Sequence, residues 1–148
     1  MSKVVLFAAL ALAACTARQT ESGGIDIDPV SDRVGNWTAS LTPQNGSGIS
    51  GQVAARSELM SSGVSVTIWG AKSGDTHPWH VHRGTCGNDM GIVGGAEAYP
   101  ALQVGANGNA SASANLKTPL SEDASYFVNV HKSPSELGTI VSCGPLNH

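Results

Sequence analysis

The chain has 148 residues, 13% of them charged, and a formal net charge of −3. This length suits one domain with a sizeable core, and a hydrophobic content of 41% excludes a wholly disordered chain. A weakly acidic chain without a basic run also argues against a nucleic-acid binder, which would neutralise phosphates with Lys and Arg. The three cysteines are an odd number, so one of them needs a role outside an internal disulfide.

Residues 1–14 have the features of a secretory signal peptide. Lys3 precedes an apolar run at residues 4–12, and two alanines follow before Cys15. The run is roughly half of the ~20 residues that a transmembrane helix needs. Residues 12–15 also resemble the bacterial lipobox, in which the cysteine is lipidated and becomes the mature N-terminus. An ordinary cleavage site beside a chance cysteine is the alternative.

A lipid on Cys15 would anchor the protein to a bilayer without spanning it. Thr16 follows the cysteine, in place of the Asp associated with inner-membrane retention. We therefore expect a periplasm-facing lipoprotein of the bacterial cell envelope, at the outer membrane. Residues 15–34 contain Gly, Pro and acidic side chains with little apolar periodicity, which predicts a flexible tether. The folded domain would then span residues 35–148.

The rest of the chain predicts an all-β domain. Val64, Val66 and Ile68 alternate with polar residues, as in a strand with one buried face. Gly, Pro, Asn and Ser separate such segments. After the predicted signal peptide, no window longer than one or two turns shows the apolar periodicity of a helix. The predicted strands are residues 37–41, 49–53, 64–68, 79–82, 99–104, 110–116, 125–131 and 138–143. Eight antiparallel strands over about 110 residues favour a β-sandwich or flattened barrel.

The histidines carry the strongest chemical signal. His80 and His82 are two residues apart in a predicted strand, so both imidazoles project from one face. His131 ends another predicted strand and could supply a third nitrogen across the sheet. Neutral imidazole is a good ligand for copper and zinc. An isolated His-x-His pair more often binds no metal, but here the pair occurs with a further strand histidine and two cysteines.

These motifs resemble those of the copper/zinc superoxide dismutase family. Residues 77–87 (His-Pro-Trp-His-Val-His, then Cys-Gly) are similar to that family's His-Gly-aromatic-His-x-His segment and the cysteine after it. Residues 129–138 are similar to its Val-His-Glu segment with the downstream Asp-Asp-Leu-Gly. Residues 142–144 (Ser-Cys-Gly) resemble its closing Ala-Cys-Gly. The resemblance covers about residues 35–146.

This resemblance implies an eight-stranded antiparallel Greek-key barrel that holds one copper ion. It implies three copper ligands, which are His80, His82 and His131. His77 matches a position that supports the site from behind, and whether it also joins the coordination sphere stays open. The resemblance further implies a disulfide between Cys86 and Cys143, which leaves Cys15 for the lipid anchor.

The chain departs from the family pattern at the zinc site. No histidine lies between Cys86 and His131, so the bridging histidine and the zinc histidines are missing and no zinc is expected. Ile140 stands where the family has a substrate-guiding Arg. Arg83 and Lys132 flank the proposed ligands and could partly replace that Arg, although strand alternation would place them on the opposite face.

Other residues are given ordinary roles. We expect packing roles for the larger apolar side chains Trp37, Trp69, Tyr99, Phe127, Met60 and Met90, although a thioether could also bind copper. Asp89 and Glu97 are interpreted as solvated loop charges. His148 is interpreted as a terminal residue that could act as a labile fourth ligand.

Three functions are compatible with these features. The leading hypothesis is a copper-binding envelope lipoprotein that captures or handles copper, or dismutates superoxide slowly. The first alternative is a genuine copper-only superoxide dismutase, which converts superoxide to oxygen and hydrogen peroxide; the acidic charge and the missing Arg weaken it. The second alternative is a metal-free β-sandwich interaction module. Residues 126–131 also resemble a chordin-type domain, which weakens the enzyme hypothesis. The expected partners are a copper ion and a membrane, and the oligomeric state stays open.

Overall fold

The structure is a computed structural model that describes residues 35–148. The predicted signal peptide (1–14), the lipidated Cys15 and the predicted tether (15–34) lie outside the described residues. Among residues 35–148, no helix is long enough and apolar enough to cross a membrane.

The described chain is all-β, as the sequence predicts. Its strands are β1 (Gly35–Pro43), β2 (Ser50–Ser57), β3 (Ser62–Trp69), β4 (Thr76–His77), β5 (Trp79–Thr85), β6 (Asn88–Ile92), β7 (Leu102–Gln103), β8 (Ala110–Leu116), β9 (Tyr126–His131) and β10 (Ile140–Leu146). A short 3-10 turn, η2 (Ala96–Ala98), lies between β6 and β7. Eight strands form one antiparallel sheet in the order β6-β5-β9-β10-β1-β2-β3-β8, and β4 pairs with β7.

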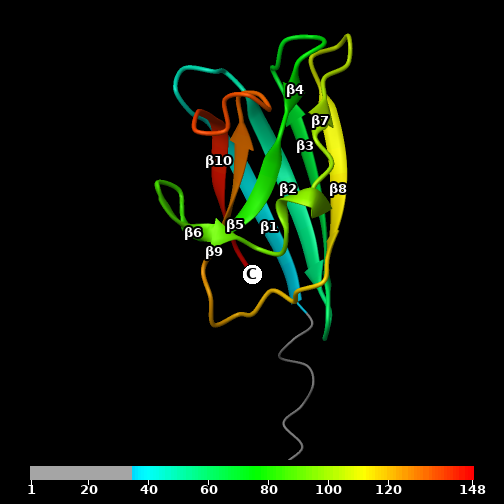
Figure 1. Cartoon of the computed structure of the whole chain (residues 1–148), viewed down its shortest axis with the longest axis vertical. Helices are drawn as coiled ribbons and strands as arrows, with labels where there is room; N and C mark the ends of the chain where they lie inside the picture. The colour runs from blue at the N-terminus through cyan, green and yellow to red at the C-terminus, as the bar shows by residue number, and fades with distance from the viewer. Residues whose placement is uncertain (1–34) are drawn as a thin grey trace, which may run out of the picture.

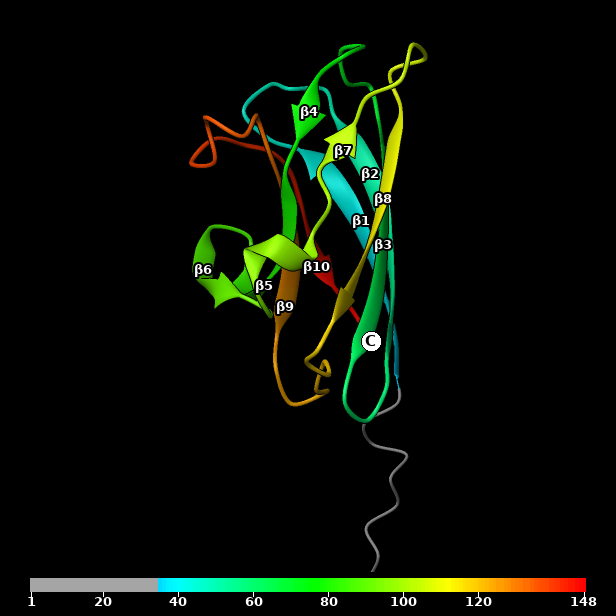
Figure 2. The same cartoon turned by 45° about the vertical axis from the view of Figure 1, so that its right-hand side comes forward.

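The sheet curls into a half-barrel with two facing walls (Figure 1, Figure 2). The wall of β5, β9 and β10 faces the wall of β1, β2, β3 and β8, and the core fills the space between them. On β3, Val64, Val66 and Ile68 are buried and the residues between them are exposed. Trp79 and Val81 of β5 belong to the same buried cluster. The period-two prediction is therefore confirmed for the strands that carry it most clearly.

Two segments differ from the predicted elements. Of residues 99–104 only Leu102–Gln103 is a strand, because Tyr99 is the residue that ends η2. β6 has no signal in the sequence, since all five of its side chains are exposed and no apolar alternation marks it. It forms by pairing with β5, with Asp89 opposite Gly84 and Ile92 opposite His82.

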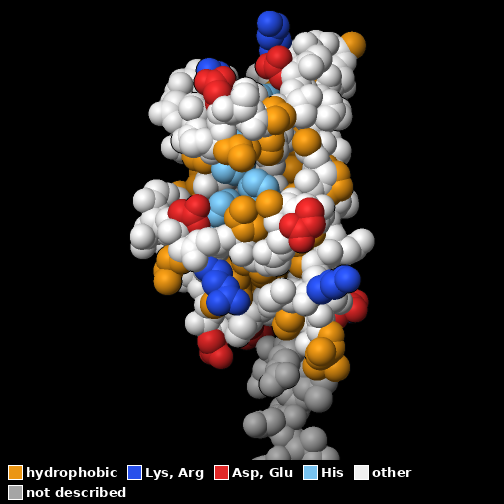
Figure 3. Space-filling view, in the orientation of Figure 1, with side chains coloured by type: hydrophobic (Ala, Val, Ile, Leu, Met, Phe, Trp, Pro, Cys, Tyr) orange, Lys and Arg blue, Asp and Glu red, His pale blue; other side chains and the backbone are white. Residues whose placement is uncertain are grey.

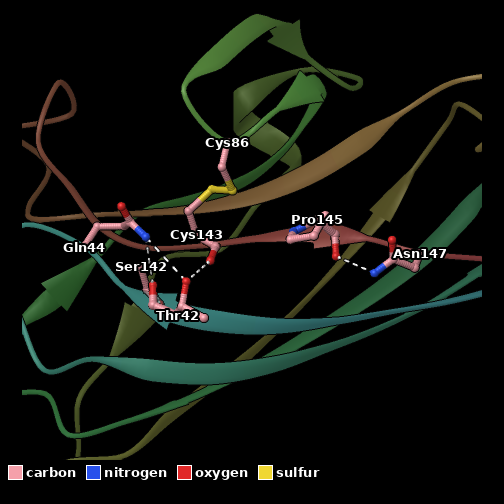
Figure 4. Close-up of a disulfide and its surroundings, with 7 residues drawn as sticks. All are labelled: Thr42, Gln44, Cys86, Ser142, Cys143, Pro145 and Asn147. Atoms are coloured by element: carbon pink, nitrogen blue, oxygen red, sulfur yellow. Dashed lines mark hydrogen bonds between the residues drawn. A yellow bond between two sulfur atoms is a disulfide. The ribbon is translucent and has the colours of Figure 1, made fainter.

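The outward face of β5 and β9 is covered by a second layer of loops. β9 is buried along its whole length. A disulfide joins Cys86, in the turn after β5, to Cys143 of β10, with the two Cα atoms 6.2 Å apart (Figure 4). The Thr42 hydroxyl of β1 donates to the Cys143 carbonyl at 3.1 Å, which fastens this part of β10 to the opposite wall. The disulfide that the family resemblance implies is present.

Candidate metal centre

Three histidines meet on the covered face of β5 and β9. Alternation along β5 sends Val81 into the core and sends His80 and His82 outward. β9 runs antiparallel beside β5, with His80 opposite Asn129. The backbone N–H of His131 donates to the Pro78 carbonyl at 2.8 Å, which brings the end of β9 alongside the start of β5. One ligand atom from each of the three histidines lies within 4.8 Å of the other two.

Hydrogen bonds fix which ring nitrogen is free in two of these side chains. His82 Nδ1 donates to the Asp89 carboxylate at 2.9 Å, and His131 Nδ1 donates to the Leu137 carbonyl at 2.6 Å. Because each Nδ1 carries the proton, each Nε2 keeps a lone pair in the neutral ring. A carboxylate or carbonyl behind each ring is the usual arrangement for a metal-binding histidine.

His80 presents its Nδ1 to the same point. Its Nδ1 lies 3.0 Å from His131 Nε2, and donates to it because the other nitrogen of His131 already holds that ring's proton. A metal ion bound by both nitrogens would replace this shared proton. His82 Nε2 is buried and has no hydrogen-bond partner within residues 35–148. A buried acceptor without a partner is unfavourable, and a metal ion at this position would satisfy it.

Burial keeps His80 and His131 neutral. Desolvation, with smaller contributions from His131 and His82, lowers the pKa of His80 from 6.5 to about 4. Desolvation also lowers the pKa of His131, although its bond to the Leu137 carbonyl opposes the change. The Tyr99 ring packs edge-on against His80, with centroids 5.2 Å apart, and its hydroxyl donates to the Val93 carbonyl. The His80 and His131 rings are therefore neutral near pH 7, which is the state that binds metals.

Asp89 is the residue that the sequence interpretation misses. It is half-exposed, as expected of a solvated charge, but it lies in β6 and its Oδ1 accepts from both His82 Nδ1 and the Gly91 N–H, the latter at 2.7 Å. Burial opposes ionisation of Asp89, but these hydrogen bonds outweigh it and lower its pKa. The β6 hairpin brings the carboxylate back over β5. Glycines 84, 87 and 91, all with positive φ, are the only sequence signal of that hairpin.

His77 lies behind the cluster. Its Nδ1 donates to the backbone carbonyl of His131 at 3.0 Å, so it contacts a candidate ligand residue through the main chain. It is buried and is not one of the three histidines whose ligand atoms converge. A surface hollow of about 820 Å³ includes His77 but none of those three.

Other sequence candidates lie elsewhere. His148 Nε2 pairs with Glu122 at 2.8 Å, and its ring packs on Trp37, so this structure does not bring it to the cluster. The packing expected of Met60 and Met90 is wrong, because their side chains are 79% and 72% exposed. Glu97 lies in η2. The packing expected of the aromatic residues is confirmed, with Trp37, Tyr99 and Phe127 buried and Trp69 on the sheet surface.

The approach to the cluster is acidic. Figure 3 shows histidine side chains in a hollow at the middle of this face, with acidic side chains on both sides and the Lys and Arg side chains toward the upper and lower ends. A hollow of about 470 Å³ is lined by His131, Asp89, Asn129 and Leu137, among others. Lys132 pairs with Glu136 at 2.8 Å, and Arg83 is exposed. The arrangement attracts cations better than anions.

No family model matches the chain, and a search of curated proteins also finds no match.

Proposed function

We propose that this chain is a copper-binding domain of the copper/zinc superoxide dismutase-like type, and that it captures or handles one copper ion. The observation that carries the proposal is that one ring nitrogen from each of His80, His82 and His131 lies within 4.8 Å of the other two. Hydrogen bonds from the Nδ1 atoms of His82 and His131 leave the Nε2 lone pairs of these two rings for a metal. The Cys86–Cys143 disulfide, which the resemblance to that family implies, also supports it.

The composition of the donor set favours copper over other metals. It consists of three imidazoles, because Asp89 is engaged as a hydrogen-bond acceptor and both domain cysteines are in the disulfide. Imidazole suits copper, zinc, iron and nickel, and copper binds most tightly among the divalent ions at a nitrogen site of this kind. The acidic surroundings favour cation uptake. Zinc at equal availability should therefore bind more weakly.

The test is a copper titration of the purified protein followed by elemental analysis. We expect one copper ion per chain, and loss of that ion when His80, His82 and His131 are all changed to Ala. His148→Ala is the matched control, because this histidine is half-exposed and paired with Glu122 outside the cluster. Equal copper retention by the wild type and the triple variant would show that the proposal is wrong.

Slow superoxide dismutation is the second candidate function. The hollow beside His131 favours it, because a small molecule can approach the cluster from the surface. Bound copper would supply the one-electron chemistry, and the protein would hold it through the three histidines. Anion steering is weak, since Ile140 stands at the guiding position and the nearby Lys132 is paired with Glu136. We expect superoxide decay faster than with the triple-Ala variant after free copper is subtracted, and equal rates would rule this function out.

The proposal also includes the location of the protein. Lipidation of Cys15 would hold the domain on the periplasmic side of the bacterial envelope, at the outer membrane. Labelled palmitate should be incorporated by the wild type and not by Cys15→Ser, which should move to the soluble fraction. Labelling that persists in Cys15→Ser would contradict this part of the proposal.

A further inference from the structure

The wall opposite the metal centre has an open outward face with an unusual composition. Along β1, β2, β3 and β8, the exposed residues are Ser, Thr, Asn, Gln, Ala, Gly, Pro and one Trp, and Arg56 is the single charged one. The face points away from β5, β6 and β9 (Figure 2). It is therefore separate from the candidate metal centre, with the core between them.

This face is hollowed into a groove of about 720 Å³ that crosses four strands. Asn147, which follows β10, lies at one side, and Trp69 of β3 lies at the other. Between them are the small or neutral side chains of Thr38, Gln52, Ala54 and Thr67. The backbone registers place these residues on neighbouring strands, with Thr38 opposite Ala54 and Gln52 opposite Thr67.

The chemistry of the groove fits one class of ligand. The Trp69 indole is 41% exposed, and it offers a large rigid apolar surface on which the C–H face of a pyranose ring can pack. The Gln52 amide and the Thr38 hydroxyl can both donate and accept hydrogen bonds, as sugar hydroxyls do. The Thr67 hydroxyl bonds to the Ser111 hydroxyl at 2.9 Å and the Asn147 amide donates to the Pro145 carbonyl at 3.3 Å, so each of these two keeps only its remaining hydrogen-bonding capacity for a ligand. The groove residues include no charged side chain. We propose that this groove binds a neutral oligosaccharide.

A second copy of the chain is a poorer occupant. Protein interface cores are enriched in aromatic residues, Met and Arg and depleted in Ser and Ala, whereas this face is rich in Ser and Thr. A two-fold dimer also needs a self-complementary patch, and two hollows that face each other leave their centre unfilled. An oligosaccharide instead fills a hollow of this size and matches its neutral polar surface.

The experiment uses the full chain and three neutral hexasaccharides: chitohexaose and cellohexaose, which are β-1,4-linked, and α-1,4-linked maltohexaose. Titration calorimetry measures the affinity and tryptophan fluorescence reports contact with the indole. We expect saturable binding of at least one probe, and binding about tenfold or more weaker in Trp69→Ala, because Trp is among the residues that most often dominate a binding site. Gln52→Ala should weaken binding less.

Two controls make the outcome decisive. Asn115→Ala removes an exposed amide of β8 outside the groove, and His82→Ala removes a candidate metal ligand; both should bind the saturating probe as the wild type does. Because the second control keeps the groove intact, failure of the metal proposal would not affect this one. Absence of saturable binding to all three probes, equal binding by Trp69→Ala, or a dimer in sedimentation that Trp69→Ala dissociates would each overturn the proposal.

Discussion

The outward faces of the two walls of the half-barrel differ in their exposure to solvent. On β3 the outward side chains Ser65, Thr67 and Trp69 are exposed. On β9 the outward side chains Phe127, Asn129 and His131 are buried, as are His80 and His82 on β5. The difference arises because the β6 hairpin, at the edge of the sheet, and the loop before β10 cover only one wall.

The two walls also differ in how their polar side chains are satisfied. Burying a polar side chain is unfavourable unless it gains hydrogen bonds or a ligand. The open wall avoids that penalty by leaving its polar residues in water. On the covered wall, a carboxylate and a carbonyl accept hydrogen bonds from His82 and His131 and so offset the cost of burying them. His82 Nε2 has no hydrogen-bond partner among residues 35–148.

Loss of the disulfide should have the largest effect on stability, because it joins the turn that leads into the β6 hairpin to β10. The β6 hairpin and the loop before β10 are together called the cover of the β5–β9 wall. Cys86 and Cys143 are 57 residues apart in sequence, and closing a loop of this length stabilises a fold by about 4 kcal/mol. We expect the double Ala variant to lose roughly that amount in urea unfolding, and to bind copper more weakly as the β6 hairpin loosens. Thr85→Ala, an exposed change on β5, is the control. A loss below about 1 kcal/mol would mean that other contacts hold the cover.

The covered wall should also make stability depend on pH. The folded pKa of His80 is lowered from 6.5 to about 4, so below pH 6.5 the unfolded chain takes up a proton that the folded chain does not. The free energy of unfolding therefore falls as pH drops through this window, by up to about 1.4 kcal/mol per unit and roughly 3 kcal/mol in all. The lowered pKa of His131 adds in the same direction. Urea unfolding with a chelator present measures this, and His80→Phe should flatten the profile; stability that rises toward pH 4 would contradict it.

The sequence predicts the open wall far better than the cover. Strict alternation in β3 arises because one face of the strand is exposed to solvent and the other is buried. The sequence also shows that His80 and His82 share a face, because alternate residues of a strand project to the same side. β9 reads as a strand, but its burial on both faces depends on loops distant in sequence. Asp89 could not be assigned to His82, because β6 carries no apolar pattern and its pairing is set by glycine turns.

Substitution of Asp89 tests whether the β6 hairpin affects the metal affinity of the histidines or only shields them from solvent. Asp89→Ala removes the acceptor from His82 Nδ1, so the ring is free to change tautomer and orientation. We expect copper affinity to fall by about 10- to 100-fold, as is typical for such supporting groups, whereas Asp89→Asn should lose less because its amide oxygen can still accept. Competition with a copper chelator measures the affinity, and Asp123→Asn is an exposed control. Unchanged copper affinity in Asp89→Ala would show that the carboxylate does not support the metal site.

The smallest effect is expected on the open wall. Thr38 is exposed on β1, and its backbone, not its hydroxyl, pairs with Asn147. Thr38→Val keeps the β-branched shape, and its altered atom stays in water. We therefore expect a change within about 0.5 kcal/mol in urea unfolding, with unchanged copper binding because the core separates the two walls. A loss of stability well above that figure would show that hydroxyl groups order the outward face of β1. The distinction between a solvent-exposed wall and a covered wall would then not hold for β1.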